Sequence, residues 1–283
     1  MDTVINNSIN PKAVLITGCS SGIGLCVAQG LQARGYRVFA TARKHEDVSH
    51  LQELGLESMH LDLNDTLSMQ NAIKKIMHLT EGKLYALFNN GAYALPGAVE
   101  DLPTDALRQE FDTNFFGWHE LTRMVIPIMR KQGYGRIIQN SSVLGLIALK
   151  FRGAYVASKY AVEGLSDTLR QELMGTNIHI SLVEPGPIES QFRANSFEQY
   201  KKHIDKDNSH FKASYEAMEK RLTTAGPAVP FTLPPEAVLK RVIHALESKK
   251  PKARYYVTFP TYLFGYLKRM LSTRLMDKIL SKV

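Results

Sequence analysis

Short runs of apolar residues recur along the chain, and between them apolar residues are spaced three and four positions apart. The runs predict six buried strands, at residues 13–17, 36–41, 56–61, 84–89, 135–140 and 178–184. Spacings such as Ile23, Val27 and Leu31 predict helices that cover a sheet face. This alternation predicts an α/β fold with a single doubly wound parallel sheet and helices on both faces, because right-handed crossovers lay each helix against the sheet. The length suits one domain, which we expect to span residues 1–283.

Two segments near the C-terminus depart from this alternation. Residues 189–234, after the sixth predicted strand, are rich in polar and aromatic side chains, and we expect them to form a helical lid over a substrate pocket. Residues 261–283 are predicted to form one basic amphipathic helix, whose apolar stripe is Leu263, Leu267, Leu271, Leu275 and Ile279. Such a helix suits either peripheral contact with an anionic membrane or packing of its apolar stripe on the substrate-binding part of the protein or on a second subunit, and we favour packing.

The composition is that of an ordinary globular protein, with 44% hydrophobic and 22% charged residues. The two cysteines, Cys19 and Cys26, are too few to hold this chain by disulfides, which indicates a reducing compartment. No apolar run reaches the about 18 residues of a membrane span, and residues 1–11 lack the profile of a secretory signal. We therefore expect a cytoplasmic protein. The histidines form no ligand cluster, so no metal is expected.

The formal net charge of +8 is concentrated at one end of the chain. Residues 240–283 contain eleven basic and two acidic residues, a local charge of +9, whereas the first 239 residues contain 24 basic and 25 acidic ones. Because the main body is neutral and no zinc-finger or RNA-binding motif is present, we expect no nucleic-acid partner.

A glycine-rich loop follows the first predicted strand and precedes a helix. Gly18 suits a tight turn, Gly22 would let the backbone approach a diphosphate, and Gly24 would allow close packing of helix on strand. Helix N-terminal amides would then face the phosphates. The expected phosphate-binding residues are Gly18, Ser20, Ser21, Gly22, Ile23 and Gly24. The spacing G-x-x-x-G-x-G differs from the generic G-x-G-x-x-G, so a purely structural turn stays an alternative.

The residues at the ends of the second and third strands indicate which cofactor is bound. NAD-binding sheets carry an acidic residue about 20 positions after the glycines, which binds the ribose hydroxyls. Here the first charged residue is Arg43, whose guanidinium suits a 2′-phosphate, and NADP(H) is therefore the predicted cofactor. The alternative is that Arg43 is only solvated. Asp62, which precedes Leu63, is expected to accept a hydrogen bond from the adenine amino group or, alternatively, to cap the next helix.

Four polar residues occur in an order that points to catalysis. Tyr155 and Lys159 stand four positions apart on one helix face. Ser142 follows the fifth strand, and Asn114 lies further upstream. The Tyr–Lys pair alone is uninformative in a chain with twelve tyrosines and twenty lysines, so the order of all four residues is the signal.

With these motifs the chain resembles the short-chain dehydrogenase/reductase family over residues 13–190. The resemblance includes Asn89-Asn90-Gly91-Ala92 after the fourth strand and Pro185-Gly186-Pro187-Ile188 after the sixth. The family usually has Asn-Asn-Ala-Gly at the first motif, so the local turn is expected to differ. Residues 40–43 and 254–257 are similar to the branch of 17β-hydroxysteroid dehydrogenases, retinol dehydrogenases and NADP-dependent aldehyde reductases.

The resemblance implies a Rossmann-type fold and hydride transfer between NADP(H) and a lipophilic aldehyde, ketone or alcohol. Tyr155 would donate the proton, its pKa lowered by the charges of Lys159 and the oxidised nicotinamide. Lys159 would also bind the nicotinamide ribose, Ser142 the carbonyl oxygen, and Asn114 a water that links Lys159 to solvent. The other cofactor contacts implied are Leu63, Asn90, Gly91, Pro185, Gly186 and Ile188.

The substrate side is expected to be apolar. The residues expected there are Tyr93, Ala94, 143–146, Leu149 and Phe151, joined from the lid by Phe192, Phe197, Tyr200, Phe211 and Tyr215. Alternatively, the lid aromatics only pack the lid. Family members commonly pair through helices at residues 105–130 and 154–175, which implies a homodimer or homotetramer.

Two other functions are compatible with the fold. A non-catalytic dinucleotide sensor is disfavoured by the intact Ser142, Tyr155 and Lys159. An epimerase or dehydratase of the same superfamily would have a longer C-terminal domain and a different glycine spacing.

Overall fold

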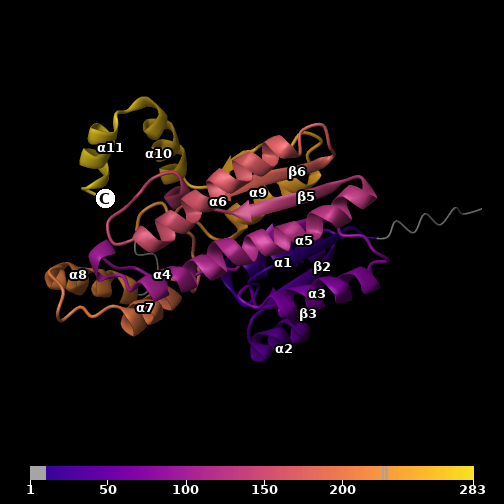
Figure 1. Cartoon of the computed structure of the whole chain (residues 1–283), viewed down its shortest axis with the longest axis horizontal. Helices are drawn as coiled ribbons and strands as arrows, with labels where there is room; N and C mark the ends of the chain where they lie inside the picture. The colour runs from indigo at the N-terminus through magenta and orange to yellow at the C-terminus, as the bar shows by residue number, and fades with distance from the viewer. Residues whose placement is uncertain (1–10, 225, 227–228) are drawn as a thin grey trace, which may run out of the picture.

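The computed structural model describes residues 11–224, 226 and 229–283. Residues 1–10, in which no secretory profile is predicted, lie outside this part. Figure 1 shows one sheet with helices packed around it, and its strands are all parallel, in the order β3-β2-β1-β4-β5-β6-β7. The strands are β1 (Ala13–Ile16), β2 (Arg37–Ala42), β3 (Glu57–His60), β4 (Ala86–Asn89), β5 (Gly135–Asn140), β6 (Ile178–Glu184) and β7 (Arg254–Tyr256). The predicted fold class is therefore confirmed.

Strand β7 was not predicted. It has only three residues, begins with the charged Arg254, and joins the edge of the sheet by pairing with β6, where Leu182 lies opposite Arg254. Nothing in such a short segment distinguishes it from a loop, because an edge strand of this length has no apolar run.

Helices cover both faces of the sheet. One face carries α1 (Gly22–Ala33), α2 (His45–Glu53) and α9 (Glu236–Glu247), whose buried apolar side chains pack on those of β1, β2 and β4. The other face carries α3 (Thr66–Leu79), α5 (Gly117–Gln132) and α6 (Gly153–Glu172). This is a doubly wound arrangement, in which ligands bind at the carboxyl ends of the strands beside the point where the strand order reverses.

Local chemistry sets the ends of these helices. The Asp65 side chain caps α3 by accepting a hydrogen bond from the Leu67 amide at 2.9 Å. The alternative role considered for Asp62, the helix cap, is wrong, because its side chain accepts from the Asn64 amide at 2.9 Å in the turn before the helix. Helix α5 ends at Gly133, whose φ of 83° lies in the left-handed region that glycine adopts readily.

The remaining helices lie beyond the carboxyl ends of the strands (Figure 1). Helix α4 (Thr104–Phe111) runs through a π-helical turn, Asp112–Phe116, into α5. Helices α7 (Phe192–His203) and α8 (Lys212–Thr223) occupy the segment predicted as a lid, and a parallel bridge between Ile188 and Leu233 joins its two ends.

The C-terminal segment forms two helices, α10 (Phe259–Met270) and α11 (Thr273–Leu280), where a single helix over 261–283 was predicted. Leu271 between them is extended, with φ −103° and ψ 148°. Residues four apart rotate by about 40° per step around a helix of 3.6 residues per turn. The stripe from Leu263 to Ile279 therefore could not stay on one side of a straight helix. Among the described residues, no helix combines the length and the apolar character needed to cross a membrane.

Candidate active site

The loop between β1 and α1 is built on glycines that admit no side chain. Gly18 has φ +68°, and a Cβ there would lie 2.5 Å from Cα of Gly91. A Cβ on Gly24 would lie 2.1 Å from the carbonyl oxygen of Gly18. A Cβ on Gly22 would lie 2.8 Å from Cβ of Ser190, which sequence analysis did not single out. The loop is thus closed against both the β4 and the β6 segments.

The first turn of α1 has the features of an anion site. Ser21 occupies the N-cap position, and its side chain makes no capping hydrogen bond, so the first amides of the helix have no partner from that side chain. Ser20 beside it is exposed. A dinucleotide diphosphate fits this N-terminus, because the amides and the helix dipole both favour negative charge.

The fourth-strand motif is bound to the glycine loop. The hydroxyl oxygen of Thr17 accepts hydrogen bonds from the amides of Asn90 and Gly91, at 2.9 and 3.0 Å. The Asn90 side chain donates to the carbonyls of Thr17 and Gly18, both at 3.0 Å. Both predicted contact residues therefore lie beside the loop, and the Asn90 side chain holds its shape.

The residues predicted to select the cofactor lie at the ends of neighbouring strands. Arg43 directly follows β2 and is exposed, and within the described part of the chain it forms no ion pair. Asp62 follows β3 and is half-buried, while Leu63 is buried beside Gly91 and Gly117. Because β1, β2 and β3 are adjacent in the sheet, these positions share one edge with the glycine loop.

Helix α6 places Tyr155 and Lys159 in the interior, at 8% and 1% exposure. The Lys159 ammonium donates to the carbonyl oxygen of Asn140 at 2.8 Å, and lies 4.1 Å from the centre of the Trp118 ring and 5.4 Å from that of Tyr155. No carboxylate of the described chain lies within ion-pair distance of it. Burial lowers the Lys159 pKa to about 7, against the opposing charges of Glu110 and Glu163.

Tyr155 and Ser142 are brought together, close enough for the Ser142 hydroxyl to lower the pKa of the Tyr155 phenol. Burial raises the pKa of Tyr155 well above its ordinary value, and the charge of Glu110 raises it further, while Ser142 opposes the shift. The expectation was that Lys159 together with the oxidised nicotinamide lowers that pKa, and in the described chain Lys159 is not among the groups that shift it. The physical reason is that a buried phenol loses hydration, and the ammonium is directed at Asn140.

Asn114 lies in the π-helical turn, and its side-chain amide is hydrogen-bonded within the protein. It accepts from the Tyr93 amide at 3.1 Å, and its NH₂ group donates to the Tyr93 carbonyl at 2.8 Å. The same NH₂ group lies 3.3 Å from both Glu110 and Ser158. Asn114 thus ties the segment after β4 to the helix, and π-helical turns of this kind are frequent at functional sites.

Glu110, which sequence analysis did not single out, is a fully buried carboxyl beneath this turn. It accepts from the Leu95 amide at 2.9 Å, and burial raises its pKa to about 8 while that hydrogen bond and the charge of Lys159 lower it. The available signal was its position four residues before Asn114, one helical turn away.

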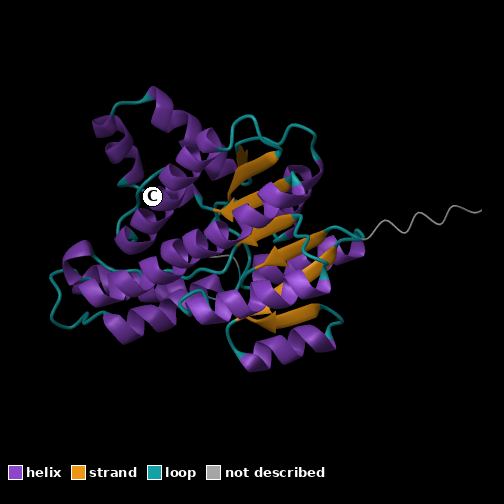
Figure 2. Cartoon of the chain, turned by 45° about the vertical axis from the view of Figure 1, so that its right-hand side comes forward, coloured by secondary structure: helices purple, strands orange, loops and turns teal. Residues whose placement is uncertain are grey.

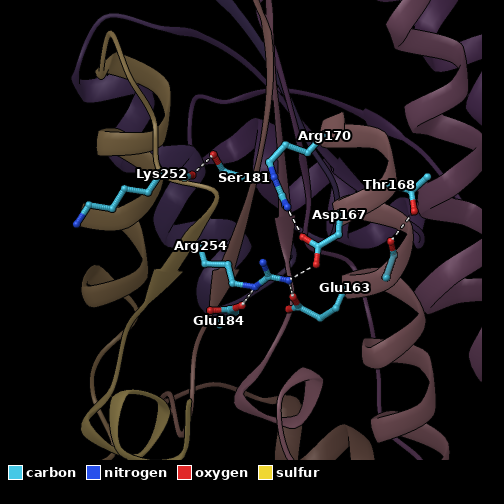
Figure 3. A network of polar contacts seen from close by, with 9 residues as sticks. Glu163, Asp167, Thr168, Arg170, Ser181, Glu184, Lys252 and Arg254 are labelled. Carbon is cyan, nitrogen blue, oxygen red and sulfur yellow. Dashed lines mark hydrogen bonds and ion pairs between the residues drawn. The ribbon is translucent and has the colours of Figure 1, made fainter. Parts of the chain in front are cut away.

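A second, partly buried polar cluster lies one turn further along α6 (Figure 3). Arg254 of β7 makes ion pairs with Glu163 and Asp167, each at 2.8 Å, and with Glu184 at 3.1 Å. Glu184 is the last residue of β6 and directly precedes Pro185 and Gly186 of the predicted cofactor loop. The cluster therefore joins the helix of Tyr155 to that loop. Gly186 itself is close-packed, since a Cβ there would lie 2.2 Å from the Thr258 hydroxyl.

The lid aromatics divide into two groups. Phe192 of α7 packs against the Tyr155 ring, with ring centres 5.4 Å apart. The others pack with Phe151 into a separate apolar cluster away from Tyr155: Phe197, Tyr200, Phe211 and Tyr215. For these four, the alternative that they pack the lid itself describes what the structure shows.

Comparison with known proteins agrees with this geometry. Residues 12–201 match the short chain dehydrogenase family. The uncharacterised oxidoreductase YbbO of Escherichia coli (strain K12) is 42% identical over 277 residues, 98% of this chain and 97% of that protein. An NADPH-dependent 3-dehydrocapnine reductase of Ornithobacterium rhinotracheale is 31% identical, covering 96% of each chain. Human 17-beta-hydroxysteroid dehydrogenase type 1 is 33% identical, over 87% of this chain and 77% of that protein.

Solved structures share the fold. A short-chain dehydrogenase from Streptomyces avermitilis superposes with a TM-score of 0.78 at 24% identity, covering 97% of this chain and 98% of that one. The chain belongs to the short-chain dehydrogenase/reductase family and is a nicotinamide-dependent oxidoreductase that acts on CH–OH or C=O groups.

Proposed function

We propose that the protein is an NADP(H)-dependent reductase of lipophilic aldehydes or ketones, and in reverse a dehydrogenase of the corresponding alcohols. The observation that carries this proposal is the buried Tyr155 phenol, with Ser142 close to it and the Lys159 ammonium 5.4 Å from its ring centre. A carbonyl that accepts a hydride becomes an alkoxide, which must be protonated in the same active site.

Preference for NADP(H) is supported by Arg43 and by the lack of a carboxylate at the end of β2. The name of one full-length relative, an NADPH-dependent reductase, agrees with it. In the proposed complex, the α1 N-terminus binds the diphosphate, Arg43 the 2′-phosphate, and Asp62 the adenine amino group. When bound, the reduced nicotinamide supplies the hydride.

Residues of the chain itself would supply the proton that the substrate oxygen takes up. Because burial keeps its pKa high, the Tyr155 phenol remains protonated at neutral pH and can donate to the carbonyl oxygen. Ser142 would orient that oxygen by a hydrogen bond. Lys159 would hold the nicotinamide ribose and stabilise the phenolate that forms, and Asn114 would help return the proton from solvent.

The substrate is proposed to be lipophilic because the residues of the sequence expected around the carbonyl are mostly apolar and include no evident pair of arginines to bind a carboxylate or phosphate. Phe192 lies against the Tyr155 ring, and Val143 and Leu144 directly follow Ser142. We also propose that the protein works in the cytoplasm as a homodimer or homotetramer paired through α4, α5 and α6. Phe116 and Leu165 in this region are 54% and 39% exposed, as an unfilled apolar interface would be.

The test is an assay of purified protein with NADPH or NADH against medium-chain aldehydes, ketosteroids and retinoids. We expect turnover with NADPH on at least one lipophilic carbonyl, and a Tyr155→Phe variant that still binds NADPH but turns over about a hundredfold more slowly or worse. Tyr134→Phe, at an exposed tyrosine that precedes β5 and lies outside the predicted site, is the matched control. Tyr155→Phe activity within tenfold of the wild type would exclude the proposed proton donor.

The same preparation tests the cofactor preference. Arg43→Ala should weaken NADPH binding by about 1.5–3 kcal/mol, the value of a charge-assisted hydrogen bond, and NADH binding far less. Lys44→Ala, at the next exposed residue, controls for general loss of charge. Equal losses for both cofactors would refute the contact between Arg43 and the 2′-phosphate.

A further inference from the structure

The outward face of helix α10 is apolar. Each of its exposed apolar side chains has another three or four residues away, and together they share one face: Phe259, Tyr262, Leu263, Tyr266 and Met270, at 56, 38, 39, 57 and 79% exposure. The opposite face is buried through Thr261 and Gly265, where a Cβ on Gly265 would lie 2.7 Å from the Tyr256 ring. A surface helix normally turns polar side chains outward, so this stripe indicates a face that another body covers.

The apolar face extends beyond α10. The Phe231 ring, 57% exposed, packs on Phe259 with centres 4.9 Å apart, and Leu275 of α11 is 45% exposed. Figure 2 shows α10 and α11 as a pair of helices that projects from the body, away from the sheet. We call residues 259–283 the C-terminal hairpin. The packing on the protein that the sequence favoured thus holds for one face of α10 only.

The hairpin is also strongly basic. It contains five basic residues and a single acidic one, Asp277: the basic residues are Lys268, Arg269, Arg274, Lys278 and Lys282. Lys268 donates to the Tyr160 hydroxyl at 2.9 Å and so fixes the hairpin to α6. The other four make no ion pair within the described chain, so their charge is available to an external anion.

We propose that the C-terminal hairpin docks the protein on the surface of an anionic lipid bilayer. A bilayer complements both features of this surface, because it offers an apolar layer for the stripe and negative headgroups for the basic residues. Exposed tyrosines suit the boundary between the two, because an aromatic ring with a hydroxyl is itself amphipathic. A second copy of the chain complements it poorly, since a two-fold contact would set this basic hairpin against an identical one.

The position of the hairpin gives docking a consequence for catalysis, which rests on the proposed function. Helix α10 packs against the turn Val143–Gly145, which directly follows Ser142. A docked bilayer would therefore lie beside the turn that follows Ser142, near the site proposed for a lipophilic substrate.

The experiment is co-sedimentation of the full-length protein with vesicles of phosphatidylcholine alone, or of phosphatidylcholine and phosphatidylglycerol in equal parts. Salt is varied from about 0.01 M to about 1 M, where the Debye length falls from about 30 to about 3 Å. We expect binding to the anionic vesicles at low salt, about tenfold weaker binding to the neutral ones, and release at high salt.

Two exposed double variants separate the apolar and basic contributions. Tyr266→Ser with Met270→Ser should reduce binding about tenfold at every salt concentration, and Arg274→Ser with Lys278→Ser should also reduce its salt dependence. The matched controls are Met174→Ser, 77% exposed at the end of α6, and Lys74→Ser with Lys75→Ser on α3. The controls should bind as the wild type does, and all variants should keep its melting temperature and its activity on a short soluble aldehyde.

Three results would overturn the proposal. The first is wild-type binding to anionic vesicles no stronger than to neutral ones, and the second is an equal loss of binding in the control variants. The third is a fall in molar mass by light scattering when Tyr266 and Met270 are replaced, which would show that a second copy covers the stripe. None of these outcomes depends on turnover, so failure of the docking proposal is distinguishable from failure of the proposed function.

Discussion

Two cations that lie against helix α6 differ in what surrounds them: Lys159, which is buried in the first half of the helix, and Arg254 of β7, which is partly buried beside the second half. Arg254 contacts three carboxylates within 3.1 Å, from Glu163, Asp167 and Glu184. Lys159 contacts one backbone carbonyl at 2.8 Å and an aromatic ring, with no carboxylate at ion-pair distance among the described residues. The carboxylates raise the Arg254 pKa further above its ordinary value, while burial lowers the Lys159 pKa to about 7.

The difference separates two kinds of cluster. In the structural cluster the charge of Arg254 is compensated by Glu163, Asp167 and Glu184. In what we call the poised cluster, around Lys159, no carboxylate of the described chain lies at ion-pair distance. Compensated buried charges lock elements together, and the Arg254 cluster joins α6, β6 and β7. A buried ammonium without a counter-ion is costly, and it persists where a ligand or a reaction uses it. We infer that the second half of α6 anchors the helix, so that its first half can present Tyr155 and Lys159 in a fixed position.

The largest effect is expected where the poised cation is removed. Lys159→Met should lower kcat/KM by about a hundredfold or more and weaken cofactor binding, because the ammonium is proposed to serve both. Its free energy of unfolding should stay equal to that of the wild type or rise, since no buried charge remains to be desolvated. Steady-state kinetics, cofactor titration and urea denaturation measure the three quantities, with Lys74→Met on the exposed face of α3 as the control. A large loss of stability with intact kcat/KM would reverse the comparison.

The opposite pattern is expected at the structural cluster. Arg254→Met leaves buried carboxylates without their cation, and should lower the free energy of unfolding by about 3–5 kcal/mol at neutral pH. Arg254→Lys keeps the charge but loses the planar fork, so it should cost less. The stability of both variants is measured by urea denaturation. Their kcat is then determined without urea, at a temperature where each variant is fully folded. The comparison fails if Arg254→Met unfolds like the wild type and loses only its activity.

The strands were predictable because parallel strands buried on both faces read as continuous apolar runs. Strands β5 and β6 have the predicted bounds, and the motif residues that follow β1, β4, β5 and β6 lie at one edge of one parallel sheet. Tyr155, Lys159 and Ser142 were identifiable for the same reason, since each lies at a fixed place relative to a strand that could be recognised.

The polar clusters were not predictable in this way. Arg254 reaches Glu163 and Asp167 across 91 and 87 positions of sequence, and no local pattern records such a pairing. A weak signal existed, because Glu184 ends a strand in which every residue except His179 is buried, and a charge in such a place requires a partner. The π-helical turn at Asn114 and the break at Leu271 depend on packing against distant segments, which propensity does not describe.

The smallest expected effect is a change in the pH dependence of stability. Burial raises the Glu184 pKa from its ordinary 4.5 to about 9, the charge of Glu163 adds to the shift, and Arg254 opposes it. Between these two values the folded protein binds more protons than the unfolded chain, so the free energy of unfolding falls as pH rises from about 4.5 to about 9. Glu184→Gln cannot ionise, and its amide can still face Arg254 and Glu163. We therefore expect the free energy of unfolding of Glu184→Gln to depend less steeply on pH than that of the wild type. The difference in slope should be a fraction of the about 1.4 kcal/mol per pH unit that one proton contributes.

Urea denaturation at acidic, neutral and alkaline pH measures the slope, with the exposed Glu100→Gln as the control. Because Glu184 belongs to the structural cluster, the pH profile of kcat should stay that of the wild type. A shifted kcat profile with an unchanged stability slope would place Glu184 with Lys159 in the poised cluster.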